Sequence, residues 1–457
     1  MTLSHMQHPL ALHLWIHLTE SSPSSLPGTA TGAGRADAAA DALEGMMPGS
    51  GHLQHMPGHT YARDGRWADY ASANIGADFT VGTHPSADGA HIADMVAEDH
   101  SIAPYAATHN VYAGVHGAST DGQLSLALYG SQELRRMWTG KTGDALGCDM
   151  WGSPGMDAGY NIELMTLSRY GMWERLFAAD AEDIYSQPSV STCSLNAALR
   201  HHARGLAFAG LGDKASAEAE LGEMESLRDI IGLNKVVGYR GNDPGMFTVA
   251  TLILRARIAL VTAAGPRDSS PAAVALSISL LEQAVAEQES WVYSEPPLWH
   301  HPVRECLAEV LLHDAADPAG ALAVIDPERP VSAWTLRNRA GALRELSMQA
   351  TATVTPAEAD TAEAEATEAW VRADTGAGVP SPLPSSCLMF YAGDVTLGSA
   401  ASPDSAGGSV VLAFVVILFC AAAVVFRARQ RRGKQVTTTK YNALEGEEKE
   451  ALGPETA

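Results

Sequence analysis

The sequence predicts an all-α fold: an α-solenoid of helical hairpins, followed by a stalk and one transmembrane helix. Aromatic residues make up only 6% of the 457 residues, while alanine and leucine are abundant, which favours helices over strands. A pattern of helix, short turn and helix recurs at least five times. One long apolar run lies near the C-terminus. These three observations predict the fold class.

The helical hairpin is clearest in residues 198–227. Apolar or small residues recur there at helical spacing on both sides of a break at Gly212-Asp213. The same pattern occurs in residues 62–76, 167–180, 247–290 and 303–326. A single hairpin cannot bury its apolar face alone, so neighbouring hairpins are expected to stack into a superhelical solenoid.

We assign residues 1–350 to this repeat domain. Three low-complexity segments read as loops or insertions between helices, because they are rich in Gly, Ser, Pro or other turn-forming residues: 21–34, 82–91 and 139–159. Residues 351–406 are first acidic and then rich in Pro, Gly and Ser. They predict a last helix around 356–373 and a flexible linker to the membrane.

Residues 407–426 contain no charged side chain and are numerous enough to cross the bilayer's hydrocarbon core of about 30 Å as a helix. The basic run RARQRRGK follows at once. Because cations stay on the cytoplasmic side, the basic and then acidic tail 427–457 is expected in the cytosol, and the repeat domain in the lumen or outside. The N-terminus lacks a convincing signal peptide.

Charge and cysteine usage exclude several classes of protein. The formal net charge of −23 opposes binding to a phosphate backbone, so no nucleic-acid partner is expected. The cysteines form no CxxC pair and sit far apart, which encodes no zinc framework and leaves one or two isolated disulfides open: Cys148, Cys193, Cys306, Cys387 and Cys420. No nucleophile elbow, phosphate loop or dinucleotide fingerprint is present. The sequence therefore predicts no catalytic residue and no organic cofactor.

Histidines cluster in GHLQHMPGHTYARDGRW, residues 51–67, where His52, His55 and His59 are spaced by three and four. His13 and His17 share the four-residue spacing, which places two side chains on one helix face, as in many metal sites. One hypothesis is a site for zinc or another divalent transition metal, with these ligands: His13, His17, His55 and His59. Further ligands could come from His8, His109 and His116.

The alternative hypothesis is that these histidines pack between helices and hydrogen-bond to backbone carbonyls, Tyr61 or Tyr105. Pro57 favours it, since proline disfavours one continuous helix through the whole histidine segment. The sequence also lacks HExxH or an equivalent motif.

A second polar cluster, in SEPPLWHHPVRE, contains His300, His301 and Arg304 at the expected start of a helix. An anion or a peptide carboxylate could bind there, held by the arginine and the helix N-terminus. The alternative is a helix cap with a surface ion pair. In the tail, Tyr441 and Leu444 have the Tyr-x-x-apolar form of a sorting signal.

Six segments resemble the tetratricopeptide-repeat-domain-containing proteins, which are common in bacteria and found in some eukaryotes. They are HPLALHLWIH, GHLQHMPGHTYARDGRWADYASANI, YAATHNVYAGVHG, LSRYGMWERLF, LRHHARGLAFAGLGDKASAEAEL and SEPPLWHHPVRECLAEVLL, in this order. The resemblance covers about residues 8–346 and implies tetratricopeptide-like hairpins, but no particular reaction. Family members usually carry further helices before the first segment, so the chain resembles a member without its N-terminal part.

The sequence thus favours a single-pass membrane protein whose concave solenoid surface binds a protein or peptide partner. The competing hypothesis is a metal-binding protein or metal-dependent hydrolase that uses the histidines on the same scaffold. A third hypothesis is a structural spacer near a membrane.

Overall fold

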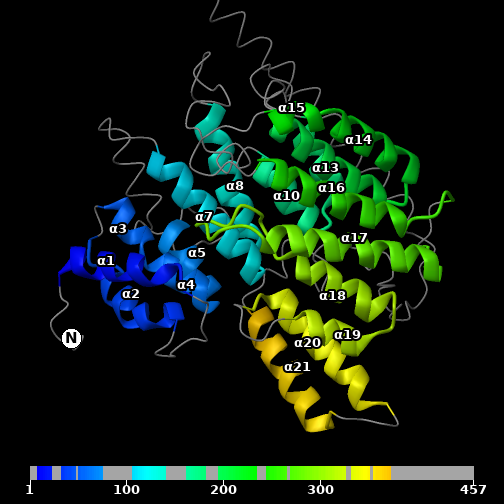
Figure 1. Cartoon of the computed structure of the whole chain (residues 1–457). Coiled ribbons are helices and arrows are strands. Elements are labelled where there is room, and N and C mark those ends of the chain that lie inside the picture. The colour runs from blue at the N-terminus through cyan, green and yellow to red at the C-terminus, as the bar shows by residue number, and fades with distance from the viewer. Residues whose placement is uncertain are drawn as a thin grey trace, which may run out of the picture. The chain divides into compact units, whose positions relative to one another are not determined.

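The computed structural model describes ten stretches of the chain (Figure 1): 8–22, 32–47, 50–75, 105–139, 161–181, 194–233, 243–264, 268–325, 331–349 and 354–371. Within these stretches the regular structure is helical and includes no β-strand, which confirms the all-α prediction. The N-terminal helices are α1 (Pro9–Glu20), the short 3₁₀ helix η2 (Gly32–Ala36), α2 (Asp37–Leu43), α3 (Gly51–His55), α4 (Pro57–Asp64), α5 (Trp67–Ile75), α7 (Tyr105–Asp121) and α8 (Leu124–Thr139).

The remaining helices follow in chain order. They are α10 (Ile162–Arg169), α11 (Trp173–Asp180), α13 (Ser194–Gly210), α14 (Lys214–Ser226), α15 (Arg228–Leu233), α16 (Asp243–Ala259), α17 (Pro271–Glu289), α18 (Val303–His313), α19 (Pro318–Val324), α20 (Ala333–Ser347) and α21 (Pro356–Val371). The last one confirms the helix predicted around 356–373.

The predicted hairpin in residues 198–227 is formed by α13 and α14. Gly212 adopts φ 80°, a left-handed conformation that favours glycine, and it reverses the chain after α13. The Asp213 side chain then accepts a hydrogen bond from the backbone N–H of Ser216 and caps α14. The turn therefore forms where the sequence predicted it.

The other predicted hairpins are present as well: α4 with α5, α10 with α11, α16 with α17, and α18 with α19. Gly65 at φ 78° and Gly171 at φ 66° take the left-handed position in the first two turns. Asp317 caps α19 in the last one. Ser270 likewise caps α17, so each of the five hairpins has a residue at its turn or next helix start whose local chemistry favours the reversal.

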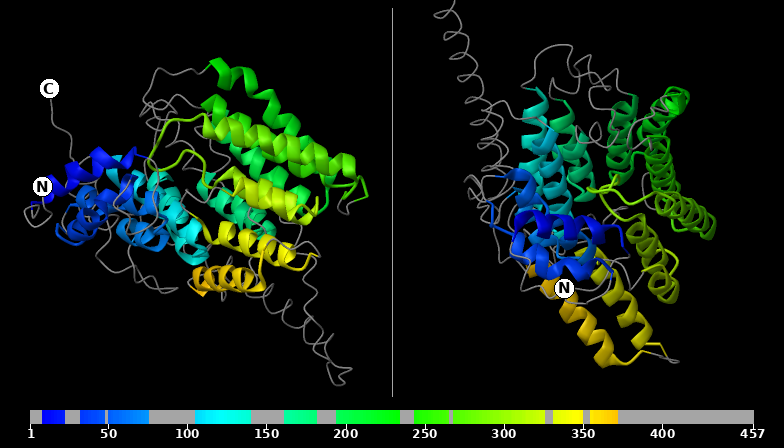
Figure 2. Two further views of the ribbon diagram at one scale, coloured as in Figure 1. Left: turned by 60° about the horizontal axis from the view of Figure 1, so that its bottom comes forward. Right: turned by 60° about the vertical axis from the view of Figure 1, so that its left-hand side comes forward.

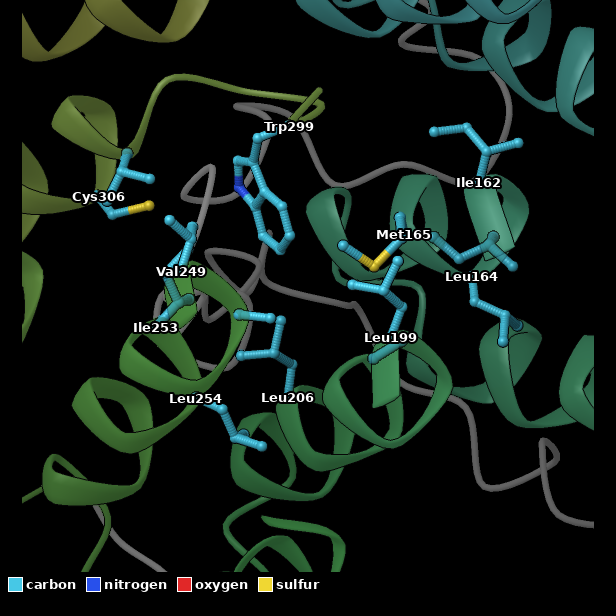
Figure 3. Close-up of a cluster of buried hydrophobic side chains, with 14 of the residues drawn as sticks. Ile162, Leu164, Met165, Leu199, Leu206, Val249, Ile253, Leu254, Trp299 and Cys306 are labelled. Carbon is cyan, nitrogen blue, oxygen red and sulfur yellow. The ribbon is translucent and has the colours of Figure 1, made fainter. Parts of the chain in front are cut away.

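The main hydrophobic core runs from α5 to α20. Figure 3 shows one part of it, where Leu206 of α13 and Ile253 of α16 point toward Trp299. Trp299 lies in the connection between α17 and α18, residues 290–302, which forms no helix. Residues 295–301 of this connection are therefore largely part of the interior, whereas Val292 and Tyr293 are exposed. Cys306, at the start of α18, is buried and disulfide-bonded, which realises one of the disulfides that the sequence left open.

A smaller core holds α1, α2 and α4 together. It contains the fully buried Leu12, Ile16, Leu43, Met56 and Tyr61. Helix α5 packs on α4 and on α7, and α3 also contacts α7. The histidine-bearing helices are therefore fixed against the beginning of the main core.

Helix α21 lies beside α20, as the views in Figure 2 also show. Ion pairs join the two helices at Arg339 and Glu365, 3.1 Å apart, and at Arg344 and Asp360, 2.8 Å apart. Residues 356–371 of the predicted linker therefore continue the helical array.

None of the described helices is long and apolar enough to span a bilayer. The predicted transmembrane segment 407–426 and the tail 427–457, with Tyr441 and Leu444, lie outside the described residues. So do residues 82–91 and almost all of 139–159. The segment 21–34 is described only at its two ends, where η2 begins at Gly32.

Candidate metal centre

Two helical segments place six titratable side chains next to one another. On α1, the spacing of His13, His17 and Glu20 sets the three side chains on one face. Met56, between α3 and α4, has helical backbone angles, φ −54° and ψ −38°, so the backbone keeps a helical course from one helix into the next. As Pro57 led us to expect, no single helix runs through all three histidines: α3 ends at His55, and α4 begins at Pro57, which occupies the first turn where its missing N–H costs nothing. His52, His55 and His59 therefore follow one another along nearly the same face.

An inner group of ligand-type atoms lies in the protein interior. His55 Nε2 is 2.9 Å from His59 Nε2 and 3.4 Å from Oε2 of Glu295, and the third side of this triangle, His59 Nε2 to Glu295 Oε2, is 3.6 Å. The side chains of the three residues are 1%, 9% and 4% exposed, respectively. We call His55, His59 and Glu295 the inner triad.

His109 of α7 adjoins the inner triad. Its Nε2 lies 3.2 Å from His55 Nε2 and 3.0 Å from Glu295 Oε2. The 290–302 connection carries Glu295 to this point from α17, and in Figure 1 it reaches toward α5 and α7. Histidines from two parts of the chain and a carboxylate from a third therefore converge.

Neighbouring side chains fix the orientation of the inner triad. Asn74 donates its amide N–H to the Tyr70 carbonyl at 2.8 Å, which turns its amide oxygen toward His55 Nδ1, 2.6 Å away. That oxygen can only accept, so His55 carries its proton on Nδ1 and presents an unprotonated Nε2. Nδ1 of His59 contacts the carboxylate of Glu20, which has no proton to give, so the ring proton of His59 belongs on Nδ1 as well. Both Nε2 atoms thus point lone pairs at the inner triad's centre.

The pKa of Glu295 and that of His109 are both lowered. Burial raises the pKa of Glu295, but attraction to His55, His59 and His109 outweighs it and holds that pKa well below its usual range. Burial lowers the pKa of His109. That attraction acts on the protonated forms of the histidines, whereas a metal ion binds the ionised carboxylate and neutral imidazoles, so an ion at this place would take over the role of the ring protons.

An outer group lies at the protein surface and is formed by His13, His17 and His52. The ligand atoms of these three residues lie within 4.8 Å of one another, and Nε2 of His13 is 3.1 Å from Nε2 of His52. Glu20 lies between the outer group and the inner triad. Its Oε1 is 2.9 Å from Nδ1 of His17, and its Oε2 contacts Nδ1 of His59.

The structure therefore divides the four histidines of the predicted metal site between two groups. His13 and His17 belong to the outer group, whereas His55 and His59 belong to the inner triad. Tyr61 does not contact them, because its hydroxyl donates to Asp41 and Glu44 on α2 and in the segment just after it. The side chain of Tyr105 lies outside the described residues.

The carboxylates and the orienting residues Tyr70 and Asn74 were not predicted from the sequence. Glu20 follows His17 by three residues on the predicted α1, so helical spacing was a usable signal for it. No local spacing points to Glu295, which comes from a distant connection.

The remaining histidines named in the sequence analysis lie elsewhere. His8 is exposed and caps α1 by accepting a hydrogen bond from the Leu10 N–H. His116 is buried near Trp67, with ring centroids 5.7 Å apart. Neither takes part in the inner triad or the outer group.

The second predicted cluster is less open than expected for an anion site. His300 and His301 are each only 5% exposed, and the His300 carbonyl accepts a 2.9 Å hydrogen bond from buried Arg169. Arg304 pairs with Glu289 of α17 and donates to the Val324 carbonyl. The contacts of Arg304 agree with the ion pair of the alternative, whereas Pro302, at the N-cap of α18, makes no side-chain capping bond.

A cavity of about 560 Å³ extends from Glu295 toward α18 and α20. Aromatic and cationic side chains line it, including Trp67, Trp291, Tyr293, Arg63 and Arg304. The inner triad therefore borders a space large enough for a small ligand or a peptide side chain.

Comparison of the chain with protein-family models, with curated proteins and with solved structures found no match. The resemblance to tetratricopeptide-repeat proteins therefore stays a prediction from the sequence segments.

Proposed function

We propose that this protein binds a divalent transition-metal ion, with zinc as the best fit, through His55, His59 and Glu295 on a tetratricopeptide-like solenoid. His109 is the fourth ligand in this proposal. Imidazole nitrogens and a carboxylate oxygen are common zinc donors, and imidazole also suits copper, iron and nickel. The proposal follows the metal-binding alternative of the sequence analysis.

The observation that carries the proposal is the triangle of lone-pair atoms. Metal–ligand bonds of about 2.0 to 2.2 Å in a tetrahedral site separate neighbouring ligand atoms by about 3.3 to 3.6 Å. The inner triad's separations of 2.9, 3.4 and 3.6 Å lie close to this range. Hydrogen-bonding partners hold the protons of His55 and His59 on Nδ1, so three electron-rich atoms face one another. These atoms repel one another, and a cation bound by all three replaces that repulsion by attraction to the ion.

The arrangement favours an ion that is held by protein ligands alone over a catalytic ion that hydrolyses a substrate. If His109 joins the inner triad, four protein ligands fill a tetrahedral ion, which is typical of structural zinc sites. A hydrolytic zinc needs a position for water. Asn74 and Glu20 contact the Nδ1 atoms of His55 and His59, as polar side chains behind the ligands orient histidines in metal proteins generally.

Metal analysis of the full-length chain tests the proposal. After exposure to zinc and removal of loosely bound ions, the wild-type protein should retain zinc at the inner triad, and chelation should lower its thermal stability. His55→Ala should abolish both effects. His201→Ala is the matched control, since His201 bonds to Glu220 at 2.7 Å on another part of the surface. A wild-type chain that retains no more zinc than the His55→Ala variant would refute the proposal.

A second candidate function is the binding of a protein or peptide partner, which the sequence analysis favoured. The specific support is the cavity next to Glu295, with its aromatic and arginine-lined walls. In this proposal the segment 407–426 anchors the solenoid to a membrane. Binding of partners by the full chain that responds to Trp291→Ala, but not to His55→Ala, would favour this function over metal binding.

A further inference from the structure

We infer that the outer group is a second metal position: His13, His17 and His52 bind a further divalent transition-metal ion, and Glu20 joins this position to the inner one. The inference deepens the proposed function and rests on it for the inner ion, whereas the outer ion is argued from separate residues.

The first argument is the convergence of three imidazoles from two helices. The rings of His13 and His17 are 4.7 Å apart between centroids, and those of His13 and His52 are 5.0 Å apart. The ligand atoms of all three lie within 4.8 Å of one another. A zinc ion with bonds of about 2.0 to 2.1 Å to nitrogen brings such atoms to about 3.3 Å, so small side-chain rotations complete the set. The 3.1 Å separation of the Nε2 atoms of His13 and His52 is already close to that value.

The second argument is the proton placement that Glu20 imposes. A carboxylate only accepts, so the contact with Oε1 keeps the proton of His17 on Nδ1 and leaves Nε2 as the nitrogen available to an ion. The other oxygen of Glu20 does the same for His59. One carboxylate therefore orients a ligand at each position, in the way that second-shell carboxylates orient zinc-bound histidines.

The two positions differ in access to solvent. The outer group contains the exposed residues His17 and His52, and the partly buried His13, whereas the inner triad is buried. An ion at the outer position can therefore exchange directly with solution. An ion at the inner position has to pass the side chains around it. The outer ion should leave first when a chelator is added.

Isothermal titration of the full-length, metal-free chain with zinc chloride tests the inference, with elemental analysis of the product. We expect two equivalents of zinc for the wild type and one for the double variant His13→Ala/His52→Ala. A chelator should remove zinc from the wild type in a fast and a slow phase. From the double variant it should remove zinc in the slow phase only. His201→Ala serves again as the control for loss of an unrelated surface histidine.

Two further variants show whether a loss of zinc binding comes from misfolding, and whether Glu20 supports both metal positions. His52→Ala alone changes an exposed side chain on α3 and should weaken the outer equivalent while it leaves the circular dichroism spectrum unchanged. Glu20→Gln should weaken both equivalents roughly 10- to 100-fold, because the carboxylate faces each imidazole with a different oxygen, and in the amide one of these two atoms becomes a donating NH2.

The outcomes separate the two proposals. If the wild type binds one equivalent, and this is lost in His55→Ala but kept in His13→Ala/His52→Ala, the outer position is refuted and the proposed function stands. If the wild type binds none, both are refuted. If two equivalents survive the double variant, the second ion lies elsewhere and the inference is wrong.

Discussion

Tyr70 donates a 2.6 Å hydrogen bond to Oε1 of Glu295, although 225 residues separate the two in the chain. Both residues are buried. The bond occupies one oxygen of the carboxylate and leaves Oε2 facing His55, His59 and His109. It also ties α5 to the connection between α17 and α18, so a single contact sets both the ligand's direction and the position of its backbone.

We expect Tyr70→Phe to lower the zinc affinity of the inner triad roughly 10-fold or more, because loss of a second-shell partner typically costs 10- to 100-fold. Competition with a zinc indicator on the full-length chain measures the change. Tyr61→Phe is the control, since its hydroxyl bonds to Asp41 and Glu44 instead. Equal affinity of wild type and Tyr70→Phe would argue that Glu295 is not oriented by this bond.

The buried pair of Arg169 and Glu305 joins α10 to α18 at 3.2 Å. Both side chains are almost fully shielded from solvent, and the guanidinium also stacks 4.2 Å from the Trp334 ring centroid. Arg169→Met leaves the Glu305 carboxylate buried without this partner, so we expect the free energy of unfolding to fall by about 3 to 5 kcal/mol.

Urea denaturation followed by circular dichroism measures this loss. The exposed pair of Arg339 and Glu365 supplies the comparison, and Arg339→Met should change stability by less than about 1 kcal/mol. Similar effects of the two substitutions would contradict the burial argument.

His202 makes stability depend on pH below neutrality. Its burial lowers its pKa to about 4, and a hydrogen bond to the Ala250 backbone opposes the shift. In the unfolded chain the ring titrates near its ordinary pKa of about 6.5. Between these values the unfolded state binds the proton and the folded state does not. As far as His202 decides it, the free energy of unfolding is therefore highest above about pH 6.5 and falls as the pH drops toward 4. The loss from this group is at most about 3 kcal/mol.

Thermal unfolding of the wild type and His202→Gln from pH 7 to pH 4 tests this. The variant should lose less stability than the wild type over that range, because the neutral amide does not titrate. His8→Gln, at an exposed position, should keep the wild-type pH dependence. Parallel curves for the wild type and His202→Gln would show that this histidine does not contribute.

Gly117 allows α7 to approach α5 closely. A Cβ at this position would lie 2.9 Å from the Ala71 backbone nitrogen and 2.9 Å from the Tyr70 ring. Gly117→Ala should therefore force the helices apart and destabilise the fold by about 1 to 3 kcal/mol. The shift should also weaken zinc binding, since Tyr70 and His109 lie on these two helices.

Gly222 of α14 is the matched control for this substitution, because nothing lies within 4 Å of an added Cβ there. Gly222→Ala should be neutral or stabilise the helix by up to about 1 kcal/mol, as expected for a helix interior. The two alanine variants are compared by urea denaturation and zinc titration. Equal stability of the two would refute the close-packing argument.

The sequence by itself determined the five helical hairpins and their turns, and the last helix, α21. Gly65, Gly171 and Gly212 mark reversals because glycine tolerates the left-handed backbone, and Asp213 marks the next helix start. These effects act within a few residues, so a local pattern contains them. Helical spacing also predicted that His13 pairs with His17, and His55 with His59.

Only the tertiary structure decided which of those histidines lie in the inner triad and which lie in the outer group. Whether the pair on α1 meets the pair on α3 and α4 depends on how α1 packs on α4, and the contacts that set this packing come from distant residues. Glu295 reaches the inner triad because the residues after it, among them Leu298 and Trp299, are buried and anchor this part of the connection in the core. Side-chain convergence across many residues follows from packing as a whole, and no short stretch of sequence encodes it.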